Sequence, residues 1–370
     1  MKYFFKIFIS LLFFIFINGC QDDGKVNYSN DIKIGFIAPL TGPVADLGAE
    51  MFNSAKLAIE HSKEQFPNIN FVLLAQDDGM NATQAATKAK SLVDQDGSLI
   101  LIGAGTTGQV KAEISAIKGR NVPLITPTAT ESNLTELGNY IFRVIPSNRA
   151  QAEAIVEFLT KKGIKNVGIL FQLNDDYSID LRGEFKKFFS NSNNKILLEV
   201  GFESDETDFK AQLSKMKNMK IDGIICFAQH VQVSRVVLRA RELNIIAPIF
   251  SGETAYTDKL IETVGSATEL YVTGATTEKS LERKKFEKKY FAKFGKRPGP
   301  YGIYAYDAIQ IAMHTIANNK PADGIELIEY LKGLQNFSGI SGEIKFNKYG
   351  DVEKKYDIFR LEEKSFRKVE

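Results

Sequence analysis

The chain has 370 residues, more than one ordinary hydrophobic core accommodates, and this length indicates two domains. Its hydrophobic share of 44% and charged share of 25% are ordinary for a globular protein, and its net charge of +2 excludes bulk attraction to a nucleic acid. Three His and two Cys leave little room for a zinc site or a disulfide framework, so we expect no metal and no cofactor.

The N-terminus carries the strongest local signal. Lys2 and Lys6 precede an apolar run at 7–17, which is too short to span a hydrocarbon layer of about 30 Å. A basic start, an apolar middle and a small residue before the cut are typical of a secretory signal peptide. We therefore expect residues 1–19 to be a signal and the mature protein to lie outside the cytoplasm.

The apolar run ends in Ile-Asn-Gly-Cys, which resembles a bacterial lipoprotein box with Cys20 as the acylated first residue of the mature chain. Asn18 is not a favoured residue in that box, and a cleaved signal followed by an incidental Cys is the alternative. The lipoprotein interpretation predicts a lipid anchor in a bacterial membrane and a flexible polar tether at 20–30.

From residue 32 onward, short apolar runs alternate with amphipathic patterns of helical period. The runs predict strands at 32–38, 69–75, 98–103, 122–126, 140–145, 166–171, 195–202, 221–228, 247–250 and 269–273. The patterns predict helices at 46–64, 82–95, 108–119, 148–162, 180–190, 207–218 and 230–243, and later at 281–294 and 301–317, before two more strands at 343–346 and 357–361. This alternation predicts an α/β fold with parallel sheets flanked by helices, and its two series predict two similar lobes.

The sequence Gly-Ala-Gly-Thr-Thr-Gly at 103–108 follows a predicted strand and opens a predicted helix. It satisfies the G-x-G-x-x-G pattern of dinucleotide-binding proteins, so a Rossmann enzyme is the alternative from a different class. Two observations disfavour it: two strand–helix units precede the pattern, and no acid ends the next strand at 122–126, where the ribose requires one. Hydroxyls at a helix N-terminus instead favour binding of a carboxylate or phosphate.

Polar residues also follow other predicted strands. The segments 126–132, 175–177 and 251–253 each come soon after a strand, and Gln229 follows the strand at 221–228. Because parallel strands end at one edge of their sheet, where α/β proteins bind ligands, these residues are candidate binding groups. A helix cap is the alternative for 126–132, and a solvated loop acid is the alternative for Glu253.

Known catalytic patterns are missing from the sequence, which contains no nucleophile elbow, no zinc-protease motif and no P-loop. Cys226 lies within an apolar strand and is predicted to be a packed small hydrophobe. Asp77 and Asp78 precede Gly79, a pattern that favours a turn over an acid–base pair. The sequence therefore favours binding over catalysis.

Several soft motifs occur in a fixed order along the mature chain. They are Gly35-Phe36-Ile37-Ala38-Pro39-Leu40-Thr41-Gly42-Pro43 with Gly48, Gln76-Asp77-Asp78, Thr126–Thr130 with Asn133-Leu134-Thr135, Phe142-Arg143, Asn174-Asp175-Asp176-Tyr177, Asp208-Phe209 and Tyr306-Asp307-Ala308. Their order and spacing over about 32–361 resemble the branched-chain amino-acid-binding family of ABC-transporter receptors.

This resemblance implies two Rossmann-like lobes joined by three crossovers, the type I periplasmic-binding fold, with no catalytic activity. Lobe 1 would comprise 31–147 with 278–347, and lobe 2 would comprise 148–277 with 348–370. A small polar ligand, in the first place an α-amino acid, would bind between the lobes and pass to an ABC permease in the membrane. A receptor for a short amide or urea and a ligand-sensing module remain open as alternatives.

The resemblance also implies roles for individual residues. Thr107 would bind the ligand carboxylate together with Thr130. The backbone carbonyl of Thr128, the Thr130 hydroxyl and the Glu253 carboxylate would hold the α-ammonium group. Tyr177 would close over the ligand from the second lobe.

The chain departs from the family pattern at several positions. Leu47 stands where such receptors often carry an aromatic residue, and Gln229 stands where they carry Tyr. Ser178 replaces a usual Gly, and the first-lobe disulfide of the family is absent. We count Leu47 and Gln229 among the expected ligand-binding residues and expect a side-chain pocket of unusual composition.

The lipoprotein interpretation is testable with Cys20→Ser. This variant should leave the membrane fraction and keep its ligand affinity, because the predicted tether lies outside the folded domain. Cell fractionation with titration of the released protein checks both expectations. A variant that stays in the membrane fraction after its signal has been cleaved would contradict the anchor.

Overall fold

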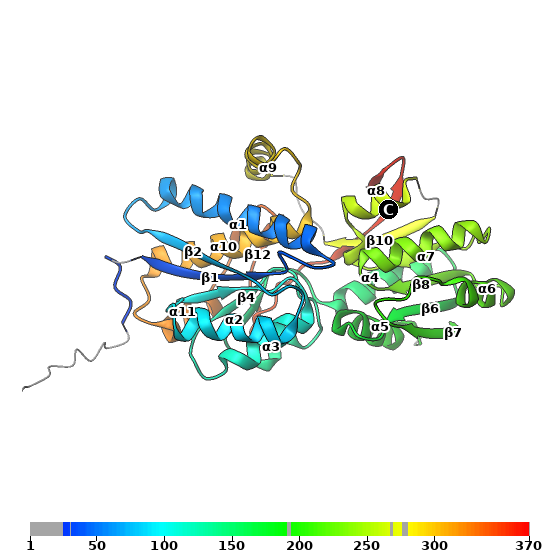
Figure 1. The fold of residues 1–370 in the computed structure, drawn as a ribbon, viewed down its shortest axis with the longest axis horizontal. Coiled ribbons are helices and arrows are strands. Elements are labelled where there is room, and N and C mark those ends of the chain that lie inside the picture. Colours follow the sequence, from blue (N-terminus) through cyan, green and yellow to red (C-terminus); the bar gives the residue numbers. More distant parts are fainter. Residues whose placement is uncertain (1–24, 30, 191–193, 267–268, 276–279, 370) are drawn as a thin grey trace, which may run out of the picture.

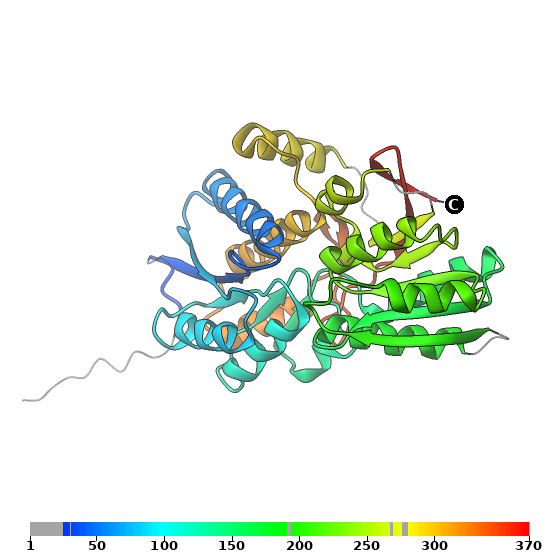
Figure 2. The same ribbon diagram turned by 45° about the vertical axis from the view of Figure 1, so that its right-hand side comes forward.

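The computed structural model describes residues 25–29, 31–190, 194–266, 269–275 and 280–369. Two sheets lie end to end and form two lobes (Figure 1 and Figure 2). The first sheet has five strands in the order β2-β1-β3-β4-β5, and the second has seven in the order β14-β13-β10-β9-β8-β6-β7. A two-stranded sheet pairs β11 with β12. The predicted α/β fold with two lobes is confirmed.

The first sheet is parallel throughout. Its strands are β1 (Ile32–Ala38), β2 (Phe71–Asp77), β3 (Ile100–Ile102), β4 (Leu124–Thr126) and β5 (Ile141–Arg143). The helices α1 (Ala45–Gln65), α2 (Ala82–Asp94) and α3 (Thr107–Ile117) follow its first three strands, and the 3-10 helix η1 (Leu134–Leu137) follows β4.

Side chains of β1 pack on both faces of this sheet. Ile34 and Phe36 pack in one buried cluster with α1 and α10, whereas Ile37 packs in another with α2 and α3. A strand that is apolar on both sides is therefore covered by helices on both sides, as a parallel sheet requires.

The second sheet combines parallel and antiparallel strands. The parallel strands are β6 (Asn166–Gln172), β7 (Lys195–Phe202), β8 (Gly223–Phe227), β9 (Ile249–Ser251) and β10 (Leu270–Ala275). Two C-terminal strands, β13 (Tyr356–Glu362) and β14 (Ser365–Lys368), extend it antiparallel at one edge. The helices of this lobe are α4 (Asn148–Lys161), α5 (Asp176–Phe189), α6 (Lys210–Asn218), α7 (His230–Glu242) and α8 (Asp258–Val264), with the 3-10 helix η2 (Glu253–Ala255).

The C-terminal third of the chain returns to the first lobe before it reaches β13. Helices α9 (Leu281–Phe294), α10 (Pro300–Asn319) and α11 (Gly324–Lys332) and strands β11 (Phe337–Gly339) and β12 (Gly342–Ile344) precede that strand. Helix α10 packs along α1, and its side chains join the same buried cluster. The N-terminal segment is held nearby, since the Val26 N–H donates to the Ala322 carbonyl at 2.6 Å.

Most of the predicted elements lie within a few residues of the observed ones, and the main differences are local. Helix α5 begins at Asp176, four residues before the predicted start, and α8, α11, β11 and β14 were not predicted. The lobe boundaries at 147/148 and 347/348 remain predictions. The boundary at 277/278, the signal at 1–19 and Cys20 lie outside the described residues.

An ion pair between a fully buried arginine and a partly exposed aspartate ties together two connections between the lobes. Arg143 ends β5 and its side chain is fully buried, and Asp351 lies between β12 and β13. Arg143 Nη2 lies 2.5 Å from Asp351 Oδ1, and Nη1 donates to the Glu131 carbonyl at 2.6 Å. The Arg143 N–H also donates to the Gly350 carbonyl at 2.9 Å. The end of the first sheet and the approach to β13 are therefore joined directly by an ion pair and a backbone hydrogen bond.

Asp351→Ala should destabilise the protein strongly, because it leaves the buried guanidinium of Arg143 without its counter-charge. Breaking a buried pair in this way typically costs about 3–5 kcal/mol in the free energy of unfolding. Urea denaturation followed by circular dichroism measures the change. Glu262→Ala, which removes an exposed partner of Lys259, is the matched control and should shift the midpoint little. Equal shifts for both variants would contradict the role of the buried pair.

Candidate functional site

The carboxyl edges of the two sheets face each other, and contacts cross between them. Lys111 Nζ, on α3, lies 3.2 Å from Asp176 Oδ2, at the start of α5. The Ser132 hydroxyl donates to Asp180 Oδ2 at 2.9 Å. These bonds join α3 and the segment after β4, in the first lobe, to helix α5 of the second lobe.

The first lobe contributes hydroxyl groups at the ends of β3 and β4. Thr107 is the first residue of α3, and Thr130 follows β4. Both side chains are buried, and the Oγ1 atoms of both have no hydrogen-bond partner among the described residues. The Thr128 hydroxyl instead donates to the carbonyls of Ala104 and Gly105, at 2.9 and 3.0 Å, and so joins the two turns.

The second lobe contributes Glu253, the first residue of η2 after β9. Its N–H donates to Gln151 Oε1 at 2.7 Å, which fixes the backbone of the turn. Its side chain is buried, and Oε2 has no hydrogen-bond partner in the part of the chain that the structure describes. The preceding residue must be glycine, because a Cβ on Gly252 would lie 1.9 Å from the Tyr177 hydroxyl oxygen.

The pKa of Glu253 is raised to about 8, mainly by burial and to a lesser extent by the nearby Asp175, while a hydrogen bond from Tyr177 opposes the shift. Burial also raises the pKa of Asp175 itself, against hydrogen bonds from Ser178 and Gln229. Gln229 Nε2 donates to Asp175 Oδ2 at 3.3 Å. Without a cation beside it, Glu253 is therefore mostly protonated at neutral pH, and a bound cation would favour its ionised form.

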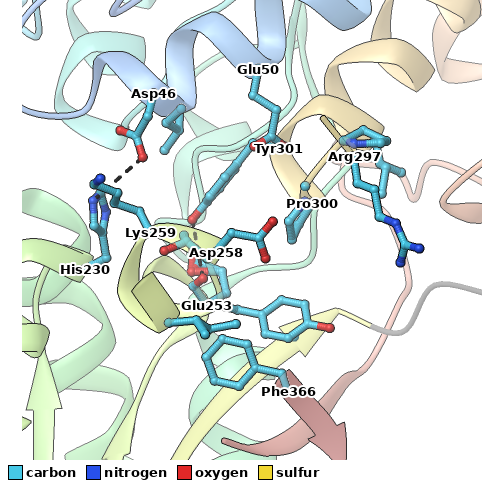
Figure 3. Close-up of a pocket in the computed structure, with 18 of the residues that line it drawn as sticks. Asp46, Glu50, His230, Glu253, Asp258, Lys259, Arg297, Pro300, Tyr301 and Phe366 are labelled. Carbon is cyan, nitrogen blue, oxygen red and sulfur yellow. Dashed lines mark hydrogen bonds and ion pairs between the residues drawn. The ribbon is translucent and has the colours of Figure 1, made fainter. Parts of the chain in front are cut away.

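A cavity of about 580 Å³ opens between the lobes next to Glu253. Figure 3 shows Glu253 in its centre, with Glu50 and Tyr301 reaching in from the first lobe. The Tyr301 hydroxyl donates to the Glu253 carbonyl at 3.5 Å, so this wall of the cavity touches the Glu253 turn directly. Leu47, on α1, also lines the cavity and packs near Gly105.

The predicted residues are thus divided between two neighbouring regions. Leu47 and Glu253 line the cavity. The remaining five lie buried at the strand ends beside it and do not line it: Thr107, Thr128, Thr130, Tyr177 and Gln229.

Sequence reasoning missed Glu50, which lines the cavity from α1. Gly302 N–H donates to Glu50 Oε1 at 2.6 Å, and burial raises the pKa of this carboxyl to about 7. The available signal was a charged residue within the apolar stripe of α1, three positions after Leu47.

The alternatives to a binding site gain no support from the fold. The glycine pattern at 103–108 follows β3, the middle strand of the first sheet, and not the first strand of the lobe. Cys226 is fully buried in β8, and burial raises the pKa of its thiol to about 12, as expected for a packed residue. Within the described ranges, no three His, Cys, Asp or Glu side chains gather as metal ligands would.

Two α/β lobes with buried polar groups and a cavity between them define a two-lobed solute-binding protein. The sequence matches the family model described as periplasmic binding protein over residues 31–365, and the chain belongs to this family. None of the helices in the described part of the chain is both long and apolar enough to span a membrane.

Known members of the family extend over nearly the whole chain. A leucine-, isoleucine-, valine-, threonine- and alanine-binding protein from Pseudomonas aeruginosa is 25% identical, covering 90% of this chain and 91% of that protein. The crystal structure of a leucine-binding protein from Thermotoga maritima matches with a TM-score of 0.85 and 26% identity, over 92% of this chain and 98% of the other. A solute-binding protein from Rhodopseudomonas palustris, in complex with 3,4-dihydroxybenzoic acid, shares the fold with a TM-score of 0.82, at 24% identity over 92% of this chain and 96% of the other.

The raised pKa of Glu253 has a measurable effect on stability. Between about pH 4.5 and about pH 8, Glu253 is protonated in the folded, ligand-free protein and ionised in the unfolded chain. The free energy of unfolding that this group contributes therefore falls as the pH rises through that window. Glu253→Gln should remove this loss, and its thermal midpoint should rise relative to wild type as the pH increases. Thermal unfolding across the window measures this difference. Glu262→Gln, whose parent side chain is 65% exposed, is the control, and a wild-type-to-variant difference that is independent of pH would contradict the prediction.

Proposed function

We propose that this protein is the lipid-anchored receptor of an ABC importer and that it binds an α-amino acid between its lobes without changing it chemically. Lipidation of Cys20 would keep the receptor at the membrane that contains the permease. The relatives named for leucine, isoleucine and valine support an amino acid as the ligand class.

One observation carries this proposal: buried polar atoms without partners occur on both sides of the cleft. The Oγ1 atoms of Thr107 and Thr130 belong to the first lobe, and Oε2 of Glu253 belongs to the second. An unpaired buried polar group costs free energy, so such atoms are expected where a ligand completes the hydrogen bonds. Two hydroxyls and a carboxylate match the two ends of a zwitterion.

The two ends of an amino acid need opposite partners. The ligand carboxylate would accept hydrogen bonds from Thr107 and Thr130 at the N-terminal end of α3 and the turn after β4, where free N–H groups favour an anion. The ligand ammonium would donate to the Thr128 carbonyl, the Thr130 hydroxyl and Glu253. A zwitterion taken out of water with either charge unmet would lose several kcal/mol, so both halves of the site are needed.

The remaining predicted residues would shape the space around this zwitterion site. Tyr177 lies against the Glu253 turn, where the Thr254 hydroxyl donates to the Tyr177 oxygen at 3.4 Å, and would cover the ligand from the second lobe. Gln229 would act through its hydrogen bond to Asp175, and Leu47 would face the ligand side chain from α1.

The raised pKa of Glu253 favours one second candidate. A neutral carboxyl can donate a hydrogen bond to a carbonyl, so a short amide or urea would suit Glu253 in its protonated form. The two candidates require different forms of Glu253. An ammonium ligand requires the ionised carboxylate, whereas an amide or urea binds the protonated carboxyl.

Calorimetric titration of Glu253→Gln distinguishes these candidates. Losing one member of a buried charge pair costs about 3–5 kcal/mol. At pH 7 the wild type loses about 1 kcal/mol of this in ionising Glu253, whose pKa is about 8, so the variant should bind the amino acid about tenfold to several hundredfold more weakly. Thr107→Ala should weaken carboxylate-bearing ligands and spare analogues without that group.

Glu157→Gln, at an exposed position of α4 outside the cavity lining, is the control and should bind as wild type does. Wild-type affinity in Glu253→Gln would mean that the ligand places no cation at this carboxyl. The amino-acid proposal would then fall, and the amide candidate would replace it.

A further inference from the structure

The cavity continues from Glu253 toward the C-terminal strands (Figure 3). Five of its lining residues form what we call the outer pocket: Tyr256, Arg283, Tyr304, Phe359 and Phe366. They come from the η2 turn, α9, α10, β13 and β14, so segments distant in sequence meet here. The Tyr256 ring lies 4.7 Å from that of Phe359 and 4.9 Å from that of Phe366, between ring centroids, which gives the outer pocket an aromatic wall.

Arg283 is the cation of the outer pocket. Its side chain is 11% exposed although it carries a permanent charge. Nε donates to Glu287 Oε1 at 2.8 Å, one turn further along α9. Nη1 is buried and has no hydrogen-bond partner among the described residues. A guanidinium with a desolvated, unpaired N–H group is stabilised by an acceptor brought in from outside.

Glu287 pairs with Nε of this guanidinium, and the charges that line the cavity decide whether Nη1 attracts a second acceptor. Of the described residues, five Asp or Glu and five Lys or Arg line the cavity, so its formal charge is balanced. Burial raises the pKa of Glu50 to about 7 and that of Glu253 to about 8, so both carboxyls carry less than a full charge when the cavity is empty at neutral pH. The residues that line the cavity therefore carry a slight excess of positive charge before a ligand enters, although Glu287, beside the lining, offsets part of the charge of Arg283.

Arg283 and Glu253 act on the same part of the cavity. The pKa of Tyr304 is raised, mainly by burial; the Arg283 charge lowers it and the Glu253 charge raises it. Both charges therefore lie within electrostatic reach of one phenol. Glu253, Tyr304 and Arg283 all line the same cavity.

We propose that the outer pocket binds an anionic group, and that the preferred ligands are α-amino acids whose side chain ends in a carboxylate. This inference rests on the amino-acid site of the proposed function and specifies its ligand class. A side-chain carboxylate would accept hydrogen bonds from Arg283, whereas a branched alkyl side chain would leave Nη1 desolvated and unpaired. The volume of about 580 Å³ lies within the range of small-molecule sites and holds such a ligand with room to spare.

Calorimetric titration of the mature protein with pairs of probes tests this proposal. The probes are glutamate against glutamine, 2-aminoadipate against norleucine, and leucine as the branched aliphatic reference. Wild type should bind at least one of the two anionic probes about tenfold to a hundredfold more tightly than its uncharged partner and more tightly than leucine, as expected for hydrogen bonds to a charged group.

Arg283→Gln should abolish this preference, chiefly by weakening the binding of glutamate and 2-aminoadipate. Lys284→Gln, the next residue on the same helix with an exposed side chain, is the control and should keep the preference. Arg283→Lys retains the charge without the planar fork and should retain part of the preference.

An unchanged affinity for glutamate and 2-aminoadipate in Arg283→Gln would overturn the proposal, as would tighter binding of leucine than of both anionic probes by wild type. The second result needs no variant, so it decides the question even if Arg283→Gln does not fold. Leucine binding that still depends on Glu253 would leave the proposed function standing while this inference falls. Absence of binding for every probe would remove both.

Discussion

Parallel strands that end at a common edge determine which residues of this protein share the cleft. In both sheets the turns after most of the parallel strands lead into helices, so hydroxyls, carboxylates and helix N-termini collect at one edge. The two edges face each other, and Lys111 and Asp176 meet across the boundary at 3.2 Å. Some of these polar groups find partners within their own lobe, as Thr128 does. Others, such as Thr107 Oγ1 and Glu253 Oε2, have no hydrogen-bond partner among the described residues.

A single amide oxygen organises the second-lobe side of that cleft. Gln151 Oε1, on α4, accepts from the Glu253 N–H at 2.7 Å and from the Thr273 hydroxyl at 2.5 Å, and the Tyr177 hydroxyl lies 3.5 Å away. Helix α4, the η2 turn, β10 and the start of α5 are thereby held at one point. The Glu253 backbone is fixed, so the protonation and pairing of its side chain are the variables that a ligand can change.

Strand-end reasoning identified Glu253 from the sequence because a lone acid directly after an apolar strand is a local pattern. The same reasoning could not find Arg283 or Tyr304, which lie on helices and reach the cavity through tertiary packing. The start of α5 was placed late because Asp176 and Tyr177 have the composition of a turn. Helix α8 was missed because its seven residues are shorter than the windows in which helical periodicity is visible.

The attachment of the N-terminal segment determines where a mechanical load enters the molecule. Val26 and Tyr28 bond to the loop between α10 and α11, the latter through its hydroxyl and the Pro321 carbonyl at 3.0 Å. This loop belongs to the first lobe, at the end away from the second (Figure 1). A pull on the leading end of the chain would therefore be borne by the outer flank of one lobe. The bonds that Asp176 and Asp180 make across the cleft would carry no tension. The second lobe would not be loaded by a pull on the N-terminal segment.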